Sequence, residues 1–232
     1  LGGRWTDILV DDTLPCVGGD GEFNTHVAYA GTVHRQLWVS LVEKAYAKVC
    51  GSYEALSGGE ASEALTLLTG WPCSVAFVDR ADFDAEALWR DLMDAQKKAF
   101  LATCTTGKDS PALQDAGLES QHVYSLLDVM RVKAANGSKV RLLKVRNPQA
   151  ERSWTGAWSN ASKCWTRKLR KQLGYEGGDD GVFFMSFSDF RRFFNHCTIC
   201  RVRSSDWQEC RAQMRLRKNE PPDRGLLLRV VE

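Results

Sequence analysis

Hydrophobic and polar residues follow two different periods in the first part of the chain. Residues 5–10 alternate and are followed by two aspartates and a proline, which predicts a strand ending in a turn. A second short strand is expected at 27–32. From residue 36 to 50, apolar residues recur every three or four positions, which predicts an amphipathic helix that ends at Gly51.

This helix is expected to bury one apolar stripe. The stripe consists of Leu37, Leu41, Ala45 and Val49, with Trp38 and Tyr46 on its flanks. If the stripe lies in a packed core, a Leu41→Ala substitution should lower the free energy of unfolding by about 2–5 kcal/mol.

The middle of the chain predicts helices and strands in turn. Residues 60–70 should form a short helix that ends at Gly70, and residues 73–78 should form a strand. Residues 82–100 predict a longer helix, with acidic residues at its start and lysines near its end, as the helix dipole favours. A polar loop is expected over 105–117.

Three further strands are expected, at 122–132, 139–147 and 181–187. Asn136 and Gly137 form a hairpin signal between the first two. A short helix is expected at 186–195, and the pattern from about residue 198 predicts the start of a new β-rich unit. Antiparallel strands packed by helices make the predicted fold class α+β.

Composition and charge argue against several classes of partner. The chain has 232 residues, with 31 basic and 29 acidic ones and a net charge of +2, which gives no argument for nucleic acid or an anionic membrane. No apolar run approaches the roughly 18–20 residues that span a bilayer. The first residues lack both a secretory signal and an initiator Met, so we expect a piece of a longer protein.

The eight cysteines favour a reducing, cytoplasmic environment over a disulfide framework. Their spacing is irregular, and a chain of this size does not need disulfide staples. Cys197 and Cys200 form a C-x-x-C pair, but the second pair or matching histidines of a zinc site are missing. We interpret them as packing thiols, with a metal or redox role as the alternative.

A histidine and an asparagine stand at the two open ends of the expected hairpin. His122 begins its first strand and Asn147 ends its second. In an antiparallel pair these positions lie side by side, so the two side chains can reach hydrogen-bond distance. An amide oxygen beside an imidazole N–H fixes the tautomer and frees the other nitrogen to act as a base, as in Cys-His-Asn proteases. The other interpretation is a satisfied structural pair.

Several longer stretches add weight to the catalytic interpretation. They are WTDILVDDTLP, KAYAKVCGSYEALSGGEASEALTLLTG, HVYSLLDV, VRNPQAERSWTGAWS and DGVFFMSFSDFRRFF. Together and in this order they resemble the calpain family of cysteine proteases. The resemblance implies a papain-like fold, with residues 1–197 as the second half of the protease core and 198–232 as the truncated start of a β-sandwich domain.

The resemblance implies catalytic roles for both residues. His122 matches the histidine of the family's G-H-A-Y-S motif, and Asn147 matches the asparagine of N-P-W-G. The nucleophilic cysteine of the family lies in a Q-G-x-x-G-D-C-W motif that this chain lacks. We therefore expect it in a preceding Cys-bearing half, which would complete an endopeptidase acting on protein substrates.

The chain departs from these motifs beside the pair. Gln121 replaces the glycine before His122, and Gln149 replaces a tryptophan that shields the pair from water. Without this tryptophan, the bond between His122 and Asn147 is expected to be exposed and to control the ring less firmly. These departures favour the alternative, a calpain-like pseudoprotease that serves as a protein-binding or scaffolding module.

The resemblance also implies a calcium site, which the residues present predict to be weak. Asp180 matches a carboxylate ligand and Asn160 offers a neutral oxygen, whereas Ser153 and Val182 replace further carboxylates. Calcium takes about six to eight oxygen ligands, and their charge sets the affinity. We therefore expect binding only above the micromolar range, unless Glu151 or Asp179 joins the site through a shift of the loops.

Overall fold

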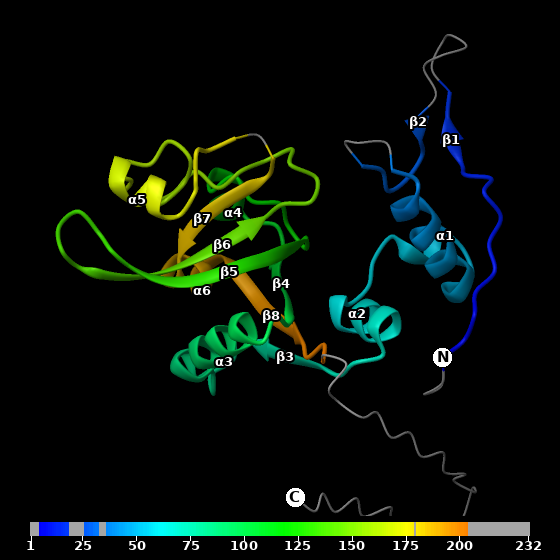
Figure 1. Cartoon of the computed structure of the whole chain (residues 1–232), viewed down its shortest axis with the longest axis horizontal. Helices are drawn as coiled ribbons and strands as arrows, with labels where there is room; N and C mark the ends of the chain where they lie inside the picture. The colour runs from blue at the N-terminus through cyan, green and yellow to red at the C-terminus, as the bar shows by residue number, and fades with distance from the viewer. Residues whose placement is uncertain (1–4, 19–25, 33–35, 179, 204–232) are drawn as a thin grey trace, which may run out of the picture.

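A six-stranded antiparallel sheet with helices packed on it forms the centre of the protein. The computed structural model describes residues 5–18, 26–32, 36–178 and 180–203. The strand order of the sheet is β3-β8-β4-β5-β6-β7, and a separate small sheet pairs β1 with β2 (Figure 1). The predicted α+β class is confirmed.

The elements have the following bounds. The strands are β1 (Cys16–Val17), β2 (His26–Val27), β3 (Cys73–Phe77), β4 (Leu101–Thr106), β5 (Val123–Lys133), β6 (Lys139–Arg146), β7 (Val182–Ser186) and β8 (Phe194–Cys200). The helices are α1 (Trp38–Cys50), the 3-10 helix η1 (Glu54–Leu56), α2 (Ala61–Thr69), α3 (Ala85–Lys97), α4 (Pro111–Asp115), α5 (Arg167–Gln172) and α6 (Phe187–Phe193). The strand expected at 5–10 is absent, and the one expected at 27–32 is reduced to β2.

Two hydrophobic cores lie on opposite faces of the sheet. The larger core packs Trp89 of α3 and Phe190 of α6 with Phe183 of β7, and all three are 0% exposed. The smaller core packs Phe184 with Trp158, near α5. Because alternate side chains of a strand point to opposite faces, both cores together bury β7 completely.

Local signals in the sequence fix the ends of the helices. The side chain of Asp84 accepts hydrogen bonds from the backbone N–H groups of Glu86 at 2.9 Å and Ala87 at 3.0 Å, and so caps the start of α3. Gly70 ends α2 with a φ of 74°, a left-handed conformation that glycine adopts without strain. Both helices therefore begin and end close to where their sequences predict.

The strands β4 and β8 are absent from the predicted set. β4 contains three threonines in the sequence LATCTT, and its pattern gives no clear strand signal. β8 lies between β3 and β4 and pairs with both, so residue 198, the expected start of a new unit, lies inside the sheet. Both strands are defined by distant partners rather than by their own pattern. The remainder of the expected β-rich unit, 204–232, lies outside the described residues.

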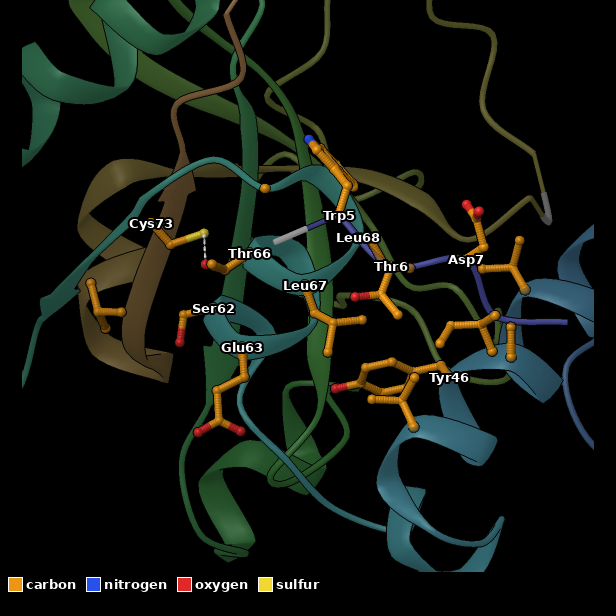
Figure 2. A pocket seen from close by; sticks show the side chains of 16 residues that line it. Trp5, Thr6, Asp7, Tyr46, Ser62, Glu63, Thr66, Leu67, Leu68 and Cys73 are labelled. Atoms are coloured by element: carbon orange, nitrogen blue, oxygen red, sulfur yellow. Dashed lines mark hydrogen bonds between the residues drawn. The ribbon is translucent and has the colours of Figure 1, made fainter. Parts of the chain in front are cut away.

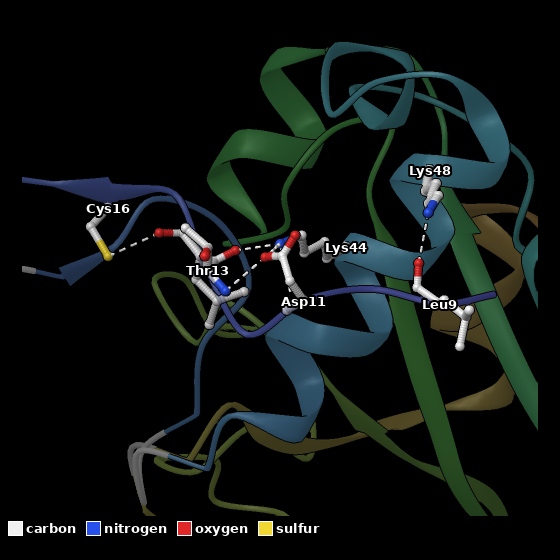
Figure 3. A network of polar contacts seen from close by, with 7 residues as sticks. Leu9, Asp11, Thr13, Cys16, Lys44 and Lys48 are labelled. Carbon is white, nitrogen blue, oxygen red and sulfur yellow. Dashed lines mark hydrogen bonds and ion pairs between the residues drawn. The ribbon is translucent and has the colours of Figure 1, made fainter.

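Residues 9–13, before β1, are held by α1 rather than by a strand partner. Lys48 Nζ donates a hydrogen bond to the Leu9 carbonyl at 2.7 Å (Figure 3). Lys44 Nζ donates to Asp11 Oδ1 at 2.5 Å and to the Thr13 carbonyl. Lysine side chains thus bind carbonyl groups that a strand would pair with a neighbour, and the strand predicted at the start of the chain is wrong.

The buried face of α1 also differs from the predicted stripe. Its buried residues are Ser40 and Ala47, whereas Leu37 and Trp38 are 58% and 62% exposed. Ser40 Oγ donates to the Ala30 carbonyl at 2.6 Å, so this small side chain lets the segment after β2 approach the helix closely. The predicted stripe is therefore wrong.

Apolar residues of α1 line a groove instead of a core. The groove has a volume of about 840 Å³ and lies among α1, α2 and the first described residues (Figure 2). Its lining includes Val42, Tyr46, Val49 and Leu67. Leu41, on the same helix, is only half-buried, so the loss of stability expected for a packed core does not apply to it.

Candidate active site

His122 lies directly before β5, at the edge where that strand pairs with β4. Its backbone N–H donates to Thr106 Oγ1 at 3.0 Å, and its carbonyl accepts from the Thr106 N–H at 3.1 Å. The preceding residue, Gln121, has a φ of 48°. The threonine at the end of β4 therefore holds the histidine backbone from both sides.

Asn147 lies directly after β6 and is 0% exposed. Its backbone N–H donates to the Gly181 carbonyl at 2.9 Å, just before β7. Its side-chain Nδ2 donates to the Arg152 carbonyl at 3.0 Å, and its Oδ1 accepts from the Gln149 N–H at 3.1 Å. These contacts fix both the place of the side chain and the orientation of its amide.

The two side chains meet, as the hairpin predicts. His122 Nε2 lies 3.0 Å from Asn147 Oδ1. Because the amide oxygen can only accept, Nε2 must carry the hydrogen of this bond, and the neutral ring keeps Nδ1 as its proton acceptor. The arrangement therefore provides an oriented base of the kind that cysteine proteases use.

A buried tyrosine packs against the histidine ring. The rings of His122 and Tyr124 meet edge to face, with centroids 5.0 Å apart. The Tyr124 hydroxyl accepts from the Glu119 N–H at 2.7 Å, and burial raises the pKa of this tyrosine to about 12. Its place in the stretch HVYS was visible in the sequence, but its contact with the ring was not.

The loop after Asn147 shields the asparagine without the tryptophan of the family motif. Gln149, at the position of that tryptophan, is exposed, whereas Asn147 is not exposed at all. His122 is half-buried. The prediction that the pair is exposed is therefore wrong for Asn147. The loop after it folds back over its side chain, and the Arg152 carbonyl of that loop accepts a hydrogen bond from Asn147 Nδ2.

A glycine allows the strand that follows to approach Asn147. Gly181 has a φ of 76°, and a Cβ at this position would lie 2.3 Å from the Asn147 carbonyl oxygen. No other residue can occupy the position without moving one of the two segments. The contact links the end of β6 to the start of β7 beside the candidate base.

The residues expected to hold calcium make other contacts. Asp180 Oδ1 accepts from the Val182 N–H at 3.1 Å, and Asn160 Nδ2 donates to the Gly178 carbonyl at 3.1 Å. Asn160 Oδ1 is buried and has no hydrogen-bond partner. Among the described residues, no group of three or more histidine, cysteine or acidic side chains could hold a metal ion. Asp179 lies outside those residues.

The groove beside α1 is separate from this pair. Neither His122 nor Asn147 belongs to its lining, which comes from α1, α2, β3 and the first described residues. Apolar volume alone therefore does not locate the candidate active site. The hydrogen bond between the imidazole and the amide does.

An imidazole oriented by an amide is an arrangement of Cys-His-Asn proteases, and comparisons with known proteins give the same class. The family model described as calpain family cysteine protease matches residues 1–201. Calpain-5 of Mus musculus is 31% identical over 96% of this chain and 38% of its own length. The calpain-type cysteine protease ADL1 of Oryza sativa subsp. japonica is 36% identical over 86% of this chain and 9% of its own length.

The chain belongs to the calpain family of cysteine proteases, and its architecture is the papain-like one of that family's protease domain. Calpain-9 of Homo sapiens is also similar, at 34% identity over 86% of this chain. The chain covers 29% of that protein, so it spans well under half of each relative named here. Within the part that the structure describes, no helix is both long and apolar enough to cross a membrane.

Proposed function

We propose that this chain supplies the general base and its orienting amide to a calpain-type endopeptidase that cleaves proteins. The observation that carries the proposal is the 3.0 Å contact between His122 Nε2 and Asn147 Oδ1. The amide of Asn147 is fully buried and fixed by further hydrogen bonds, so it holds the imidazole in one orientation and leaves Nδ1 free to accept a proton. The nucleophilic cysteine belongs to a preceding Cys-bearing half, and substrate lies in the cleft between the two halves.

In this proposal the proton moves through Nδ1 of His122. The imidazole takes the proton of the thiol, and the thiolate attacks the carbonyl carbon of the scissile peptide bond. The imidazolium then returns the proton to the leaving amine, which leaves an acyl-enzyme. A water molecule, deprotonated by the same ring, releases the acid and restores the thiol. Asn147 orients the ring and accepts from Nε2–H throughout.

Two buried cysteines of the chain are poor candidates for the nucleophile. Cys104 and Cys197 are buried, and burial raises the pKa of both thiols, to about 12 for Cys197. A thiol of such high pKa is a poor nucleophile near neutral pH. Every cysteine that the structure describes is free, which supports a reducing compartment, and we propose the cytoplasm.

A second candidate is a pseudoprotease that serves as a binding or scaffolding module. It is favoured by the backbone at Gln121, where a residue other than glycine holds a φ of 48° directly before the candidate base. Glycine would adopt this conformation without strain, so Gln121 departs from the family motif at the residue that precedes the candidate base. A cysteine at the upstream nucleophile position supports the enzyme, and any other residue there supports the scaffold.

The test compares peptidase activity on an unfolded protein. The chain joined to its Cys-bearing half should cleave, His122→Ala should abolish cleavage, and His26→Ala, at an exposed position of β2, should not. The 232-residue chain alone should be inactive. Cleavage by the chain alone, blocked by a thiol alkylator, would contradict the proposed division of roles.

Calcium binding in this half is proposed to be weak. Asp180 contributes one carboxylate, and the described neighbours add no group of acidic side chains. Charge on the ligands sets calcium affinity, so we expect binding above the micromolar range. Calcium control of the whole protein, where it exists, then comes from another part.

A further inference from the structure

Two loops that the family resemblance assigns to calcium are joined here by an arginine. Arg170 Nη2 donates to the Asn160 carbonyl at 2.5 Å. Arg170 Nη1 lies 3.5 Å from the Glu176 carbonyl, a weaker contact with the second loop. A third contact runs directly between the loops, from Asn160 Nδ2 to the Gly178 carbonyl at 3.1 Å.

The arginine is held in place by its surroundings. It lies near the end of α5, which begins at the N-cap Thr166. Its guanidinium lies 5.3 Å from the centre of the Trp165 ring and 5.5 Å from the centre of the Tyr175 ring. Both distances are within the range of cation–π attraction, so the side chain has a fixed position rather than a free one.

Carbonyl oxygens of both loops, which calcium also takes as ligands, accept hydrogen bonds from N–H groups here, whereas the buried Asn160 Oδ1 has no hydrogen-bond partner. The Gly178 carbonyl faces the amide N–H of Asn160, and an N–H group repels a cation. Asp180 brings one carboxylate, whereas Arg170 brings a permanent positive charge to the Asn160 and Glu176 carbonyls of the two loops. A divalent cation placed here would meet a fixed like charge that water screens only in part.

We propose that Arg170, together with the amide of Asn160, replaces calcium as the cross-link between these two loops. The second loop leads through Asp180 to Gly181, whose carbonyl accepts from the Asn147 N–H at 2.9 Å. The guanidinium therefore holds in place the backbone that supports the orienting amide. The link to catalysis rests on the proposed function, but the cross-link itself does not.

The first test is thermal unfolding of the full chain in calcium chloride and in chelator. The wild type should unfold at the same Tm in both. Arg170→Gln should lower the Tm by about 3 °C or more, because it removes a charge-assisted hydrogen bond to the Asn160 carbonyl and a weaker contact with the Glu176 carbonyl. Lys168→Gln, an exposed position on the same helix, is the matched loss of charge and should lower it by less than about 1 °C.

The second test restores ligand charge. A Ser153→Glu, Asn160→Asp variant should bind calcium at least tenfold more tightly when it also carries Arg170→Gln than when Arg170 is retained. Titration calorimetry with calcium chloride measures the difference. Equal affinity in the two backgrounds would overturn the proposal, as would a wild-type Tm that rises with micromolar calcium or an Arg170→Gln variant no less stable than Lys168→Gln.

None of these measurements depends on peptidase activity. If the protein is a scaffold without a nucleophile, the Tm and calorimetric results keep their meaning. An NMR signal of the His122 ring adds a readout at the pair itself, and Arg170→Gln should shift it while Lys168→Gln should not. An unchanged His122 signal in Arg170→Gln would overturn the connection from the cross-link to Asn147.

Discussion

Gln121 and Ala150 share the left-handed backbone conformation, one on each side of the His122–Asn147 pair. Their φ angles are 48° and 57°. In the family motifs both positions hold glycine, in G-H-A-Y-S and N-P-W-G. The left-handed region costs a residue with a side chain about 1–2 kcal/mol. The two departures therefore lie where the fold most favours glycine.

We predict that Gln121→Gly and Ala150→Gly each raise the free energy of unfolding, by up to about 1 kcal/mol. Relief of left-handed strain exceeds the larger conformational entropy that glycine has in the unfolded chain. Urea denaturation measures the change. Ala112→Gly in α4, where the backbone is helical, is the control and should lower stability by about 0.5–1 kcal/mol. A loss of stability at Gln121 as large as at Ala112 would show that its conformation is not strained.

We predict that Asn147→Ala lowers the free energy of unfolding by about 1–3 kcal/mol, because buried groups lose their partners. It should also free the His122 ring to adopt both neutral tautomers, whereas the wild type holds the hydrogen on Nε2. Proton–nitrogen NMR correlations of the ring distinguish the two states. Asn136→Ala, in the hairpin turn, is the control and should leave the tautomer unchanged. A wild-type ring with its hydrogen on Nδ1 would contradict the proposed base.

We predict unequal effects for two leucines that the sequence places on apolar helix faces. Leu92→Ala in α3 should lower the free energy of unfolding by about 2–5 kcal/mol, because Leu92 is 1% exposed in the larger core. Leu41→Ala in α1 should cost less than about 2 kcal/mol, because Leu41 is half-buried. Chemical denaturation of both variants tests the assignment of buried faces. Equal losses of stability would mean that Leu41 is packed in solution as closely as Leu92.

We predict that thiol reactivity divides the cysteines by burial. At pH 8, iodoacetamide should modify the exposed Cys16 and Cys50 and spare Cys104 and Cys197 until the protein unfolds. Peptide mapping by mass spectrometry shows which cysteines are modified.

Burial raises the pKa of Cys197 from 9.0 to about 12. A raised folded-state pKa stabilises the fold below the unfolded value, so stability should fall as pH rises above about 9. Chemical denaturation at pH 8 to 11 measures this fall in stability.

The local pattern of the sequence identifies most of the sheet's elements and the central pair. The strands β5 and β6 and their Asn-Gly turn form one hairpin, so the side-by-side positions of His122 and Asn147 follow from pairing between neighbours in the chain. The helices α1, α2 and α3 are likewise visible, because period and capping are properties of a few adjacent residues.

Only the tertiary structure decides which partners complete these elements. β8 enters the sheet between β3 and β4, strands that are distant from it in the chain. α1 buries Ser40 rather than Leu41, because the segment after β2 folds against that side of the helix. Arg170 likewise is an ordinary basic residue of a short helix until the loops before and after that helix fold so that their carbonyls meet its guanidinium. Periodicity shows that a segment has an apolar and a polar face. Which face is covered, and by what, depends on contacts that no local pattern contains.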